Sequence, residues 1–288
     1  MRTEKEMFDL ILNFAENDSR VRAVYMNGSR TNQNAPKDVY QDYDIVYVVE
    51  DFDTFTEDNS WIDVFGDRLI LQMPEAMRYP IGAGHFNWMM LFKDGNRLDL
   101  TLIPIQKPEL ISMDSLTVAL MDKDGILPSF PIASDKDYLI KPPSELFYLS
   151  CCNNFWWCLQ NVAKGIARDE LPYAMLMFHN VVREELHDMI SWYIGTITDF
   201  KVSAGKMGKY FKRYLPTEIY QRYMLTYSDS DYKNLWNAIY AACDLFSYLA
   251  IPVAEHCGYH YNSNEEEGMR TYLNSVRNNV YGSDCSLS

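Results

Sequence analysis

Two aspartates stand one residue apart in the run Gln41-Asp42-Tyr43-Asp44, directly ahead of the apolar segment 45–49. In an extended strand, successive side chains alternate between faces, so Asp42 and Asp44 share one face while Tyr43 turns toward a core. Two carboxylates held this close repel each other unless a cation lies between them, and their oxygens suit Mg²⁺ together with the phosphates of a nucleotide. The spacing by itself is common, so a solvent-facing strand edge that carries two acids by chance is the alternative.

A glycine-containing turn precedes these acids and carries donors that a phosphate group needs. Segment 21–26 is rich in β-forming residues and runs directly into Asn27, Gly28, Ser29 and Arg30. Glycine lets the backbone approach a phosphate closely, and the following N–H groups, the Ser29 hydroxyl and the Arg30 guanidinium can donate to its oxygens. An ordinary strand-to-helix turn with a serine cap would have the same sequence, so the turn is informative only beside the acids.

A third acid, Asp99, lies in a strand of its own. Segments 86–92 and 97–102 flank the glycine-containing turn 93–96, which is typical of a β-hairpin. Leucines at every second position of the later strand share its buried face and leave Asp99 on the other face. An acid flanked by leucines is costly to bury unless it meets water, a partner or a metal ion, and plain solvation of Asp99 is the alternative.

Taken together, these pieces resemble the nucleotidyltransferase superfamily that includes DNA polymerase β, whose pattern is Gly-Ser, a short spacer, Asp-x-Asp and a later strand carboxylate. Over its whole length the chain is more closely similar to the aminoglycoside 6-adenylyltransferases, also called streptomycin adenylyltransferases. The segments that carry this closer resemblance are 26–30, 42–46, 97–102, 151–157, 162–165 and 168–170. The first three are shared widely among nucleotidyltransferases, whereas the aromatic and Ala-Lys-Gly segments narrow the choice.

The resemblance implies transfer of AMP from ATP, the co-substrate, to a hydroxyl of streptomycin, with release of pyrophosphate and inactivation of the antibiotic. It also implies that Asp42, Asp44 and Asp99 bind Mg²⁺ and that the turn 28–30 contacts the triphosphate. These roles agree with the chemistry, because phosphoryl-type transfer depends on positioning and charge neutralisation more than on covalent help from the protein. Asp99 is the candidate general base, and a different carboxylate could serve instead.

One position departs from the family pattern. An acidic residue is expected after the run 151–153, and this chain has Asn154 there. Asparagine could hold a hydrogen bond to the acceptor but could not act as a base. Glu145 could take over, although it also fits the first turn of a helix, where negative charge is favourable. Trp157 is a candidate for stacking on a base or a sugar ring, with burial in the core as the alternative.

The resemblance further implies that a lysine from the helical region contacts the triphosphate. Lys206, in the glycine-marked basic segment 205–213, is the candidate, and Lys164 and Lys209 are its rivals. Each of them could instead be a helix-end lysine that interacts with free carbonyl groups.

The charge balance points away from nucleic acid as a partner. The 288 residues include 26 basic and 40 acidic side chains, which gives a net charge of −14. A protein that neutralises nucleic-acid phosphates needs the opposite sign, whereas an acidic cleft would attract a cationic acceptor such as streptomycin. Solubility alone is the alternative explanation of the charge.

Cysteine usage and hydropathy predict a cytoplasmic protein without membrane contact, and a monomer is expected. No basic start leads into an apolar signal segment, and no apolar run approaches the length of about twenty residues that a membrane crossing needs. The cysteines lie in helical patterns without the framework of a small disulfide scaffold, so reduced thiols are expected. The six are Cys151, Cys152, Cys158, Cys243, Cys257 and Cys285.

Hydrophobic patterning predicts an α+β fold. We expect a mixed sheet with helices over 1–127, a proline-bearing linker over 128–143 and a C-terminal α-helical bundle over 144–288. The resemblance implies that the first is the nucleotidyltransferase catalytic domain and that the helical domain binds the substrate. In the first domain a helix is expected over 4–14 and another over 110–121, with strands near residues 22, 44, 68, 87 and 98. In the second, helices are expected over 144–164, 170–195, 216–227, 231–257 and 265–279.

Two other classes of function stay open. A nucleotidyltransferase of the toxin–antitoxin type would use the same three acids but would modify a protein. A catalytically silent homologue would bind aminoglycoside or nucleotide without transferring AMP, and Asn154 is the residue that raises this alternative.

Overall fold

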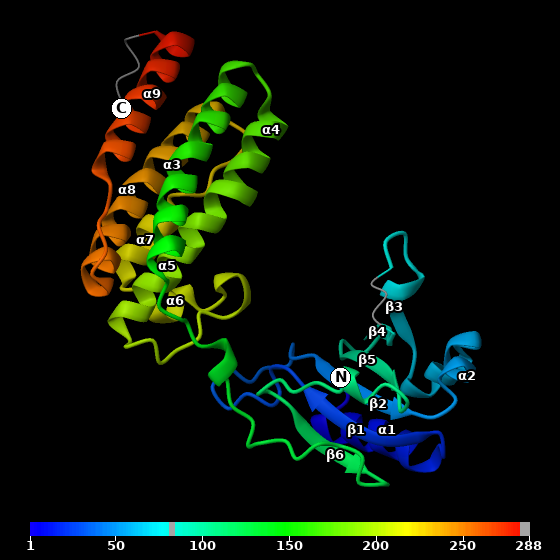
Figure 1. Cartoon of the computed structure of the whole chain (residues 1–288). Helices are drawn as coiled ribbons and strands as arrows, with labels where there is room; N and C mark the ends of the chain where they lie inside the picture. The colour runs from blue at the N-terminus through cyan, green and yellow to red at the C-terminus, as the bar shows by residue number, and fades with distance from the viewer. Residues whose placement is uncertain (81–83, 283–288) are drawn as a thin grey trace. The chain divides into compact units, whose positions relative to one another are not determined.

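The computed structural model describes residues 1–80 and 84–282. The chain divides into two compact units, Met1–Asp137 and Tyr138–Ser288, and the division falls inside the proline-bearing segment 128–143. The first unit contains a mixed sheet with helices, and the second is built from helices (Figure 1). The predicted α+β class is therefore confirmed.

Among the described residues of the first unit, 1–80 and 84–137, the sheet has six strands in the order β3-β4-β5-β2-β1-β6. Strands β2 and β5 are parallel, and the other neighbouring pairs are antiparallel. The five strands and the hairpin expected from the sequence are confirmed. The strand bounds are Val21–Asn27 for β1, Tyr43–Val49 for β2, Arg68–Gln72 for β3, Phe86–Phe92 for β4, Arg97–Pro104 for β5 and Val118–Asp122 for β6.

The helix expected over 110–121 is wrong. A single 3₁₀ turn, Pro108–Leu110, is followed by an irregular segment with a turn at 115–116 and then by β6, which pairs with β1. Thr117 Oγ1 donates to Asn27 Oδ1 at 2.8 Å just ahead of this pairing. The short apolar run at 116–121 fits helix and strand equally well, and a pairing partner about ninety residues away decided between them.

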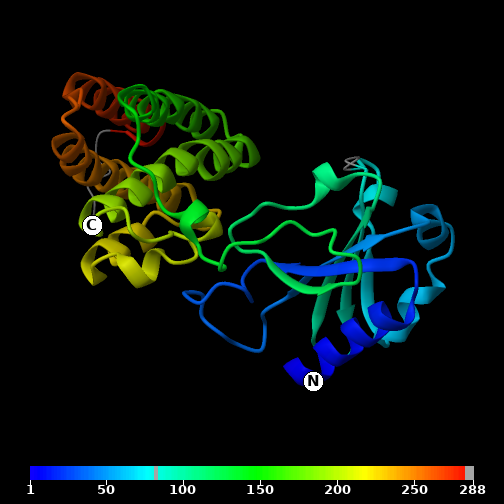
Figure 2. The same ribbon diagram turned by 60° about the horizontal axis from the view of Figure 1, so that its bottom comes forward.

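Helices cover one face of this sheet. α1 (Glu4–Asn17) runs along the sheet (Figure 2), and Thr3 caps it with a reciprocal bond to Glu6. α2 (Phe52–Glu57) contributes Phe55 to the same core. The α1 side chains buried against the strands are Met7, Ile11 and Ala15.

The opposite face is only partly covered. Segment 105–130 packs apolar side chains against Tyr25, Val48 and Ile103, which lie toward one end of the sheet. Asp44 and Asp99 occupy the same face nearer the start of their strands, and both side chains stay partly exposed. This face therefore combines a covered half with a half that solutes can reach.

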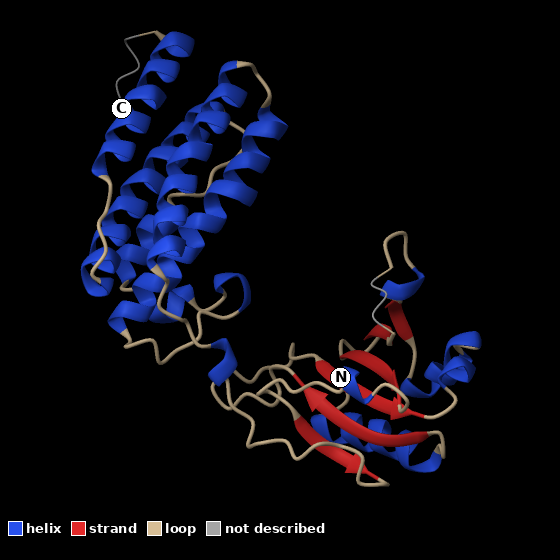
Figure 3. Cartoon of the chain, in the orientation of Figure 1, coloured by secondary structure: helices blue, strands red, loops and turns tan. Residues whose placement is uncertain are grey.

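The second unit contains helices and no strand among its described residues, 138–282 (Figure 3). A continuous helical path links α4, a π-helical turn at Met177–Val182 and α5, as the single pattern at 170–195 predicts. Phe155 of α3 stacks on Phe246 of α8 with ring centroids 3.8 Å apart in the core. The bounds are Glu145–Ala167 for α3, Leu171–Leu176 for α4, Arg183–Ile197 for α5, Phe211–Tyr214 for α6, Thr217–Met224 for α7, Tyr232–Cys257 for α8 and Ser263–Tyr281 for α9.

Within residues 1–80 and 84–282, α8 alone is long and apolar enough to cross a membrane by length and composition, with a mean hydropathy of 1.3 over its most apolar stretch. The expectation that no apolar run reaches this length is therefore wrong. The apolar side chains of α8, including Trp236 and Phe246, lie in the core of the helical unit. Packing against neighbouring helices accounts for its composition.

The cysteines of the described chain form no disulfide. Cys151, Cys152, Cys158, Cys243 and Cys257 are all free thiols, and four of the five are buried. Cys285 lies outside the described residues.

Candidate active site

Strand pairing brings two of the three predicted acids together. Asp44 of β2 stands opposite Asp99 of the parallel strand β5. Neighbouring strands lie about 4.8 Å apart, so the two side chains leave the same face side by side. Tyr43 and Leu98, their neighbours on the other face, are buried in the core, as the alternation predicts. β2 begins at Tyr43, so Asp42 lies just ahead of the strand.

The three carboxylates are close enough to perturb one another. Burial raises the pKa of Asp44 to about 6, and the negative charges of Asp99 and Asp42 add to the effect. Burial also raises the pKa of Asp42, against the opposing effect of Arg97 and with a further contribution from Asp99. This face of the sheet therefore carries more negative charge than its own cations balance.

Arg97 is the cation that lies among these acids. Its Nε donates to Asp99 Oδ1 at 2.8 Å and its Nη2 to Asp99 Oδ2 at 2.6 Å. Its Nη1 lies 3.5 Å from Asp42 Oδ2, so one guanidinium bridges the two carboxylates. The sequence analysis missed this role. Alternation along β5 could have revealed it, because Arg97 and Asp99 are two residues apart and share a face.

The residues present fit Mg²⁺ by their chemistry. Three carboxylates supply hard oxygen donors, and the raised pKa of Asp44 marks a deficit of positive charge that a divalent ion would relieve. Within the described ranges, no three Asp, Glu, His or Cys side chains already surround a shared ion position. Arg97 is hydrogen-bonded to Asp99 and ion-paired with Asp42, and it would have to release oxygens for a metal.

A pH-dependent loss of stability is expected from Asp44. Its pKa in the folded protein, about 6, lies above the ordinary aspartate value of 3.8, so the folded state favours the protonated acid. Stability should therefore be fully present below about pH 4 and decline as the pH rises through 6, by about 3 kcal/mol at most. Urea unfolding of EDTA-treated protein at several pH values measures this. The Asp44→Asn variant should lack the decline, and an equal decline in that variant would assign it to another group.

The turn after β1 fits tightly against Asp44. Gly28 has φ +80°, and a Cβ at this position would lie 2.2 Å from Asp44 Oδ2. Asn27 pairs directly with Asp44, which fixes the turn beside the carboxylate. Within 28–42, all of which the structure describes, no helix follows, so the serine-capped helix is wrong as an alternative. Glycine is needed here both for backbone conformation and for the close approach.

Arg30 braces this turn. Its guanidinium donates to the carbonyls of Asp42 at 3.0 Å and Gln41 at 2.8 Å. It also lies over the Tyr43 ring, 3.6 Å from the centroid. The backbone carbonyl of Ser29 accepts a hydrogen bond from Nε2 of the Gln41 side chain at 3.3 Å. The predicted contacts of Gly28, Ser29 and Arg30 with a triphosphate stay predictions. Arg30 would make its contact with the guanidinium N–H groups that do not donate to Gln41 or Asp42.

The predicted acceptor residues lie on α3 in the helical unit. Glu145 is exposed in the first turn of this helix, after the N-cap Ser144, where its charge is favourable in itself. Of the three consecutive aromatic residues, Phe155 and Trp156 are buried and Trp157 is 61% exposed, so the alternative that Trp157 lies in the core is wrong. A role of Trp157 in stacking stays a prediction.

Asn154 is paired with an acid that the sequence analysis missed. Its Nδ2 donates to Glu185 Oε1 at 2.5 Å, and its Oδ1 accepts from the Cys158 thiol at 3.3 Å. Glu185 lies in the first turn of α5, and no spacing rule joins it to a residue of α3. Through this bond, Glu185 places a carboxylate beside residue 154, the position where the family pattern expects an acid. Asn154 and Trp157 are three residues apart and share a helix face.

Replacing Asn154 with glutamate should destabilise the protein. The new carboxylate would meet Glu185 at hydrogen-bond distance, so one acid would have to take up a proton or move, at a cost of about 1–2 kcal/mol. Thermal unfolding at pH 7.5 should show a lowered Tm that recovers toward pH 5. As a control, Gln160→Glu adds the same charge to α3 beside Lys164 and should not lower the Tm. An unchanged Tm in Asn154→Glu would contradict the pairing.

The lysine candidates differ in their surroundings. Lys206 is exposed in a short 3₁₀ turn after Gly205, whose φ is +71°. Lys164 is partly buried, and its Nζ donates to Gln160 Oε1 one helical turn earlier at 2.7 Å. Lys209 is also exposed and lies 5.2 Å from the Tyr210 ring centroid. A contact of Lys206 with the triphosphate stays a prediction.

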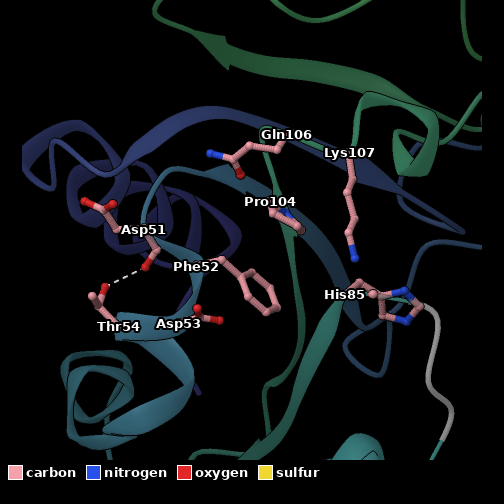
Figure 4. A pocket seen from close by; sticks show the side chains of 9 residues that line it. Asp51, Phe52, Asp53, Thr54, His85, Pro104, Gln106 and Lys107 are labelled. Carbon is pink, nitrogen blue, oxygen red and sulfur yellow. Dashed lines mark hydrogen bonds between the residues drawn. The ribbon is translucent and has the colours of Figure 1, made fainter.

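A separate pocket of about 590 Å³ lies at the opposite end of β2 and β5 (Figure 4). Asp51 and Thr54 form one side of it, joined by a bond from Thr54 Oγ1 to the Asp51 carbonyl at 2.7 Å. Lys107 and His85 lie on another side. Asp51 is seven residues beyond Asp44, about 20 Å along a strand, so this pocket is separate from the three acids.

Comparison with known proteins shows the family of this chain. The profile of the family described as streptomycin adenylyltransferase matches residues 1–276. A protein of Campylobacter jejuni named aminoglycoside 6-adenylyltransferase is 41% identical over 269 residues, which cover 93% of each chain. A protein of Bacillus subtilis (strain 168) with the same name is 39% identical over 280 residues, covering 96% of this chain and 98% of the relative. A third, from Staphylococcus aureus, is 36% identical over 97% of this chain and 99% of the relative. The resemblance stated from the sequence is thus confirmed, and the chain belongs to the streptomycin adenylyltransferase family.

Proposed function

We propose that this chain transfers AMP from ATP to a hydroxyl of an aminoglycoside, that the aminoglycoside is streptomycin, and that Mg²⁺ is required. Family membership and the names of three relatives support aminoglycoside adenylylation. The observation that carries the proposal is the alignment of Asp44 with Asp99 beside the tightly fitted Gly28 turn. It combines a concentration of carboxylates with a backbone loop that phosphates can approach.

The proposed reaction forms one bond and breaks one. The acceptor oxygen bonds to the α-phosphorus of ATP while the bond from that phosphorus to the β-phosphate oxygen breaks, and pyrophosphate leaves with the electron pair. The proton of the acceptor hydroxyl passes to a carboxylate, for which Asp99 is the candidate. Both oxygens of Asp99 accept from Arg97, so the guanidinium must shift before Asp99 can take that proton.

Asp42, Asp44 and Asp99 are the residues that would hold Mg²⁺. When bound, the ion would neutralise charge on the phosphates and on the departing pyrophosphate. The α-phosphate would then lie over β2 and β5, beside the strands that carry Asp44 and Asp99. Burial and the charges of Asp99 and Asp42 together raise the pKa of Asp44 to about 6. This supports the role, because the charged form of all three acids needs added positive charge.

Charge supports a cationic acceptor. The net charge of −14 favours attraction of a guanidinium-bearing drug at long range. In the helical unit, Glu185 and Asn154 offer a carboxylate and an amide next to the exposed ring of Trp157. We propose that this face of α3 contacts the drug, with Glu145 near the start of the same helix as a further candidate.

The test is direct. Purified protein with ATP and Mg²⁺ should release pyrophosphate only when streptomycin is added, and mass spectrometry should find streptomycin heavier by one AMP unit. Replacing streptomycin by other aminoglycosides establishes the preferred drug. Radiolabel from ATP on a polypeptide, with streptomycin unchanged, would instead favour protein modification. Calorimetric binding of streptomycin without any AMP adduct would identify a silent homologue.

A further inference from the structure

An apolar pocket adjoins the three acids on the same face of the sheet. It has a volume of about 520 Å³, and its walls include Ile70, Met77, Met89, Leu91 and Arg97. We refer to it as the methionine pocket. Ile70 is 64% exposed and Met77 is 53% exposed, although both are large apolar side chains. Such exposure beside a group of carboxylates is typical of a surface that a ligand covers.

The pocket is joined to the acids by strand register. Met89 of β4 pairs with Asp99 of β5, and Leu91 pairs with Arg97. Directly opposed side chains on one face lie about 5 Å apart, so a molecule in the methionine pocket reaches Asp99. Arg97 takes part in both places, since it lines the pocket and bridges Asp42 and Asp99.

A hydrogen-bond network holds the wall that carries Met77. Glu75, whose side chain is only 9% exposed, accepts from the backbone N–H of Asn87 at 2.9 Å and from its Nδ2 at 2.6 Å. Thr101 Oγ1 in turn donates to Asn87 Oδ1 at 2.6 Å. The 3₁₀ turn Pro74–Ala76 is thereby fastened to β4 and β5, and Met77 follows it directly. The pocket wall is therefore positioned by specific bonds.

The order of the strands decides which substrate fits there. The Gly28 turn lies at the end of β1, on one side of Asp44, and the methionine pocket lies over β3, β4 and β5, on the other side of Asp99. In phosphoryl transfer the attacking and leaving oxygens are roughly in line through phosphorus. If pyrophosphate leaves toward the Gly28 turn, the acceptor hydroxyl must approach from the side of the methionine pocket.

We propose that the methionine pocket binds the hydroxyl-bearing ring of the aminoglycoside acceptor, with Glu75 as the positioning residue that holds its wall. This assignment rests on the proposed function. Apolar side chains pack against the C–H face of a polyhydroxylated ring, and flexible thioethers adapt to its outline. The ring hydroxyls then point along the sheet toward Asp99.

The test fills the pocket and follows each substrate separately. Met77→Trp places a large ring on an exposed wall with little risk to folding. The KM for streptomycin should rise about tenfold or more, and the KM for ATP and the calorimetric Kd of a nonhydrolysable ATP analogue should change less than about twofold. Glu75→Ala should give the same split. As a matched control, Val64→Trp places the same ring at an exposed site of the helical layer on the other face and should change neither value.

The outcomes separate the pocket from the proposed function. A rise in the ATP KM or in the analogue Kd of Met77→Trp would place the nucleoside in the pocket and overturn the assignment. An unchanged streptomycin KM in a variant that still forms the AMP adduct would also overturn it, while the proposed function stands. Absence of any streptomycin adduct with the wild-type protein would refute the proposed function itself.

Discussion

Asp44→Asn is expected to abolish AMP transfer while making the metal-free protein more stable. The substitution removes one of the three carboxylates proposed to bind Mg²⁺, so turnover should fall about 10³-fold or more. It also removes a buried negative charge whose pKa is raised to about 6, so the free energy of unfolding at pH 7.5 should rise by about 1–3 kcal/mol. Pyrophosphate release and urea unfolding in EDTA measure the two effects.

Turnover should fall while the free energy of unfolding rises, and these opposite changes distinguish a catalytic role from misfolding. A variant that lost activity by misfolding would lose stability as well. Asp53→Asn is the control, because Asp53 is an exposed acid beyond the opposite end of β2. It should leave both turnover and stability close to wild type. Full activity of Asp44→Asn would show that Asp44 is not part of the catalytic group.

Gly28→Ala should be the second most damaging change. The added methyl would lie 2.2 Å from Asp44 Oδ2, so either the turn or the carboxylate must move. Positive φ adds strain of about 1 kcal/mol, and displacement of Asp44 by even 1 Å should lower kcat/KM about 10²-fold. Steady-state kinetics and thermal unfolding of the same preparation measure both.

Gly125→Ala separates the two causes. Gly125 also has positive φ, +67°, but a Cβ there would meet nothing within 4 Å. It should therefore show the backbone cost alone, with normal kinetics. Equal kinetics for Gly28→Ala and Gly125→Ala would contradict the close approach of the turn to Asp44.

Local sequence was sufficient for much of the site. The alternation of apolar residues around Asp44 and Asp99 predicted the face on which each acid lies, because side chains on a strand alternate whatever the partner strand. The hairpin of β4 and β5 followed from a glycine-containing turn between two apolar runs. The long helical patterns after residue 144 were similarly reliable, because each repeats its apolar spacing over several turns.

Other features depended on partners far away in the chain. β6 is a strand because it pairs with β1, and its own residues do not distinguish strand from helix. Glu185 meets Asn154 only because α3 and α5 pack together. Glu75 likewise positions the pocket wall by its hydrogen bonds to Asn87 of β4, which in turn accepts from Thr101 of β5.

The sequence by itself determined which residues could do chemistry, and the tertiary structure decided how they meet. Types and spacing identified Gly28, Asp42, Asp44 and Asp99, because glycine at a strand end and carboxylates at alternate positions have local physical consequences. The parallel register of β2 and β5, the bridging by Arg97 and the pocket beyond Asp99 came from the fold alone. Register and packing are properties of pairs of segments, and the free energy that selects them is spread over the whole core.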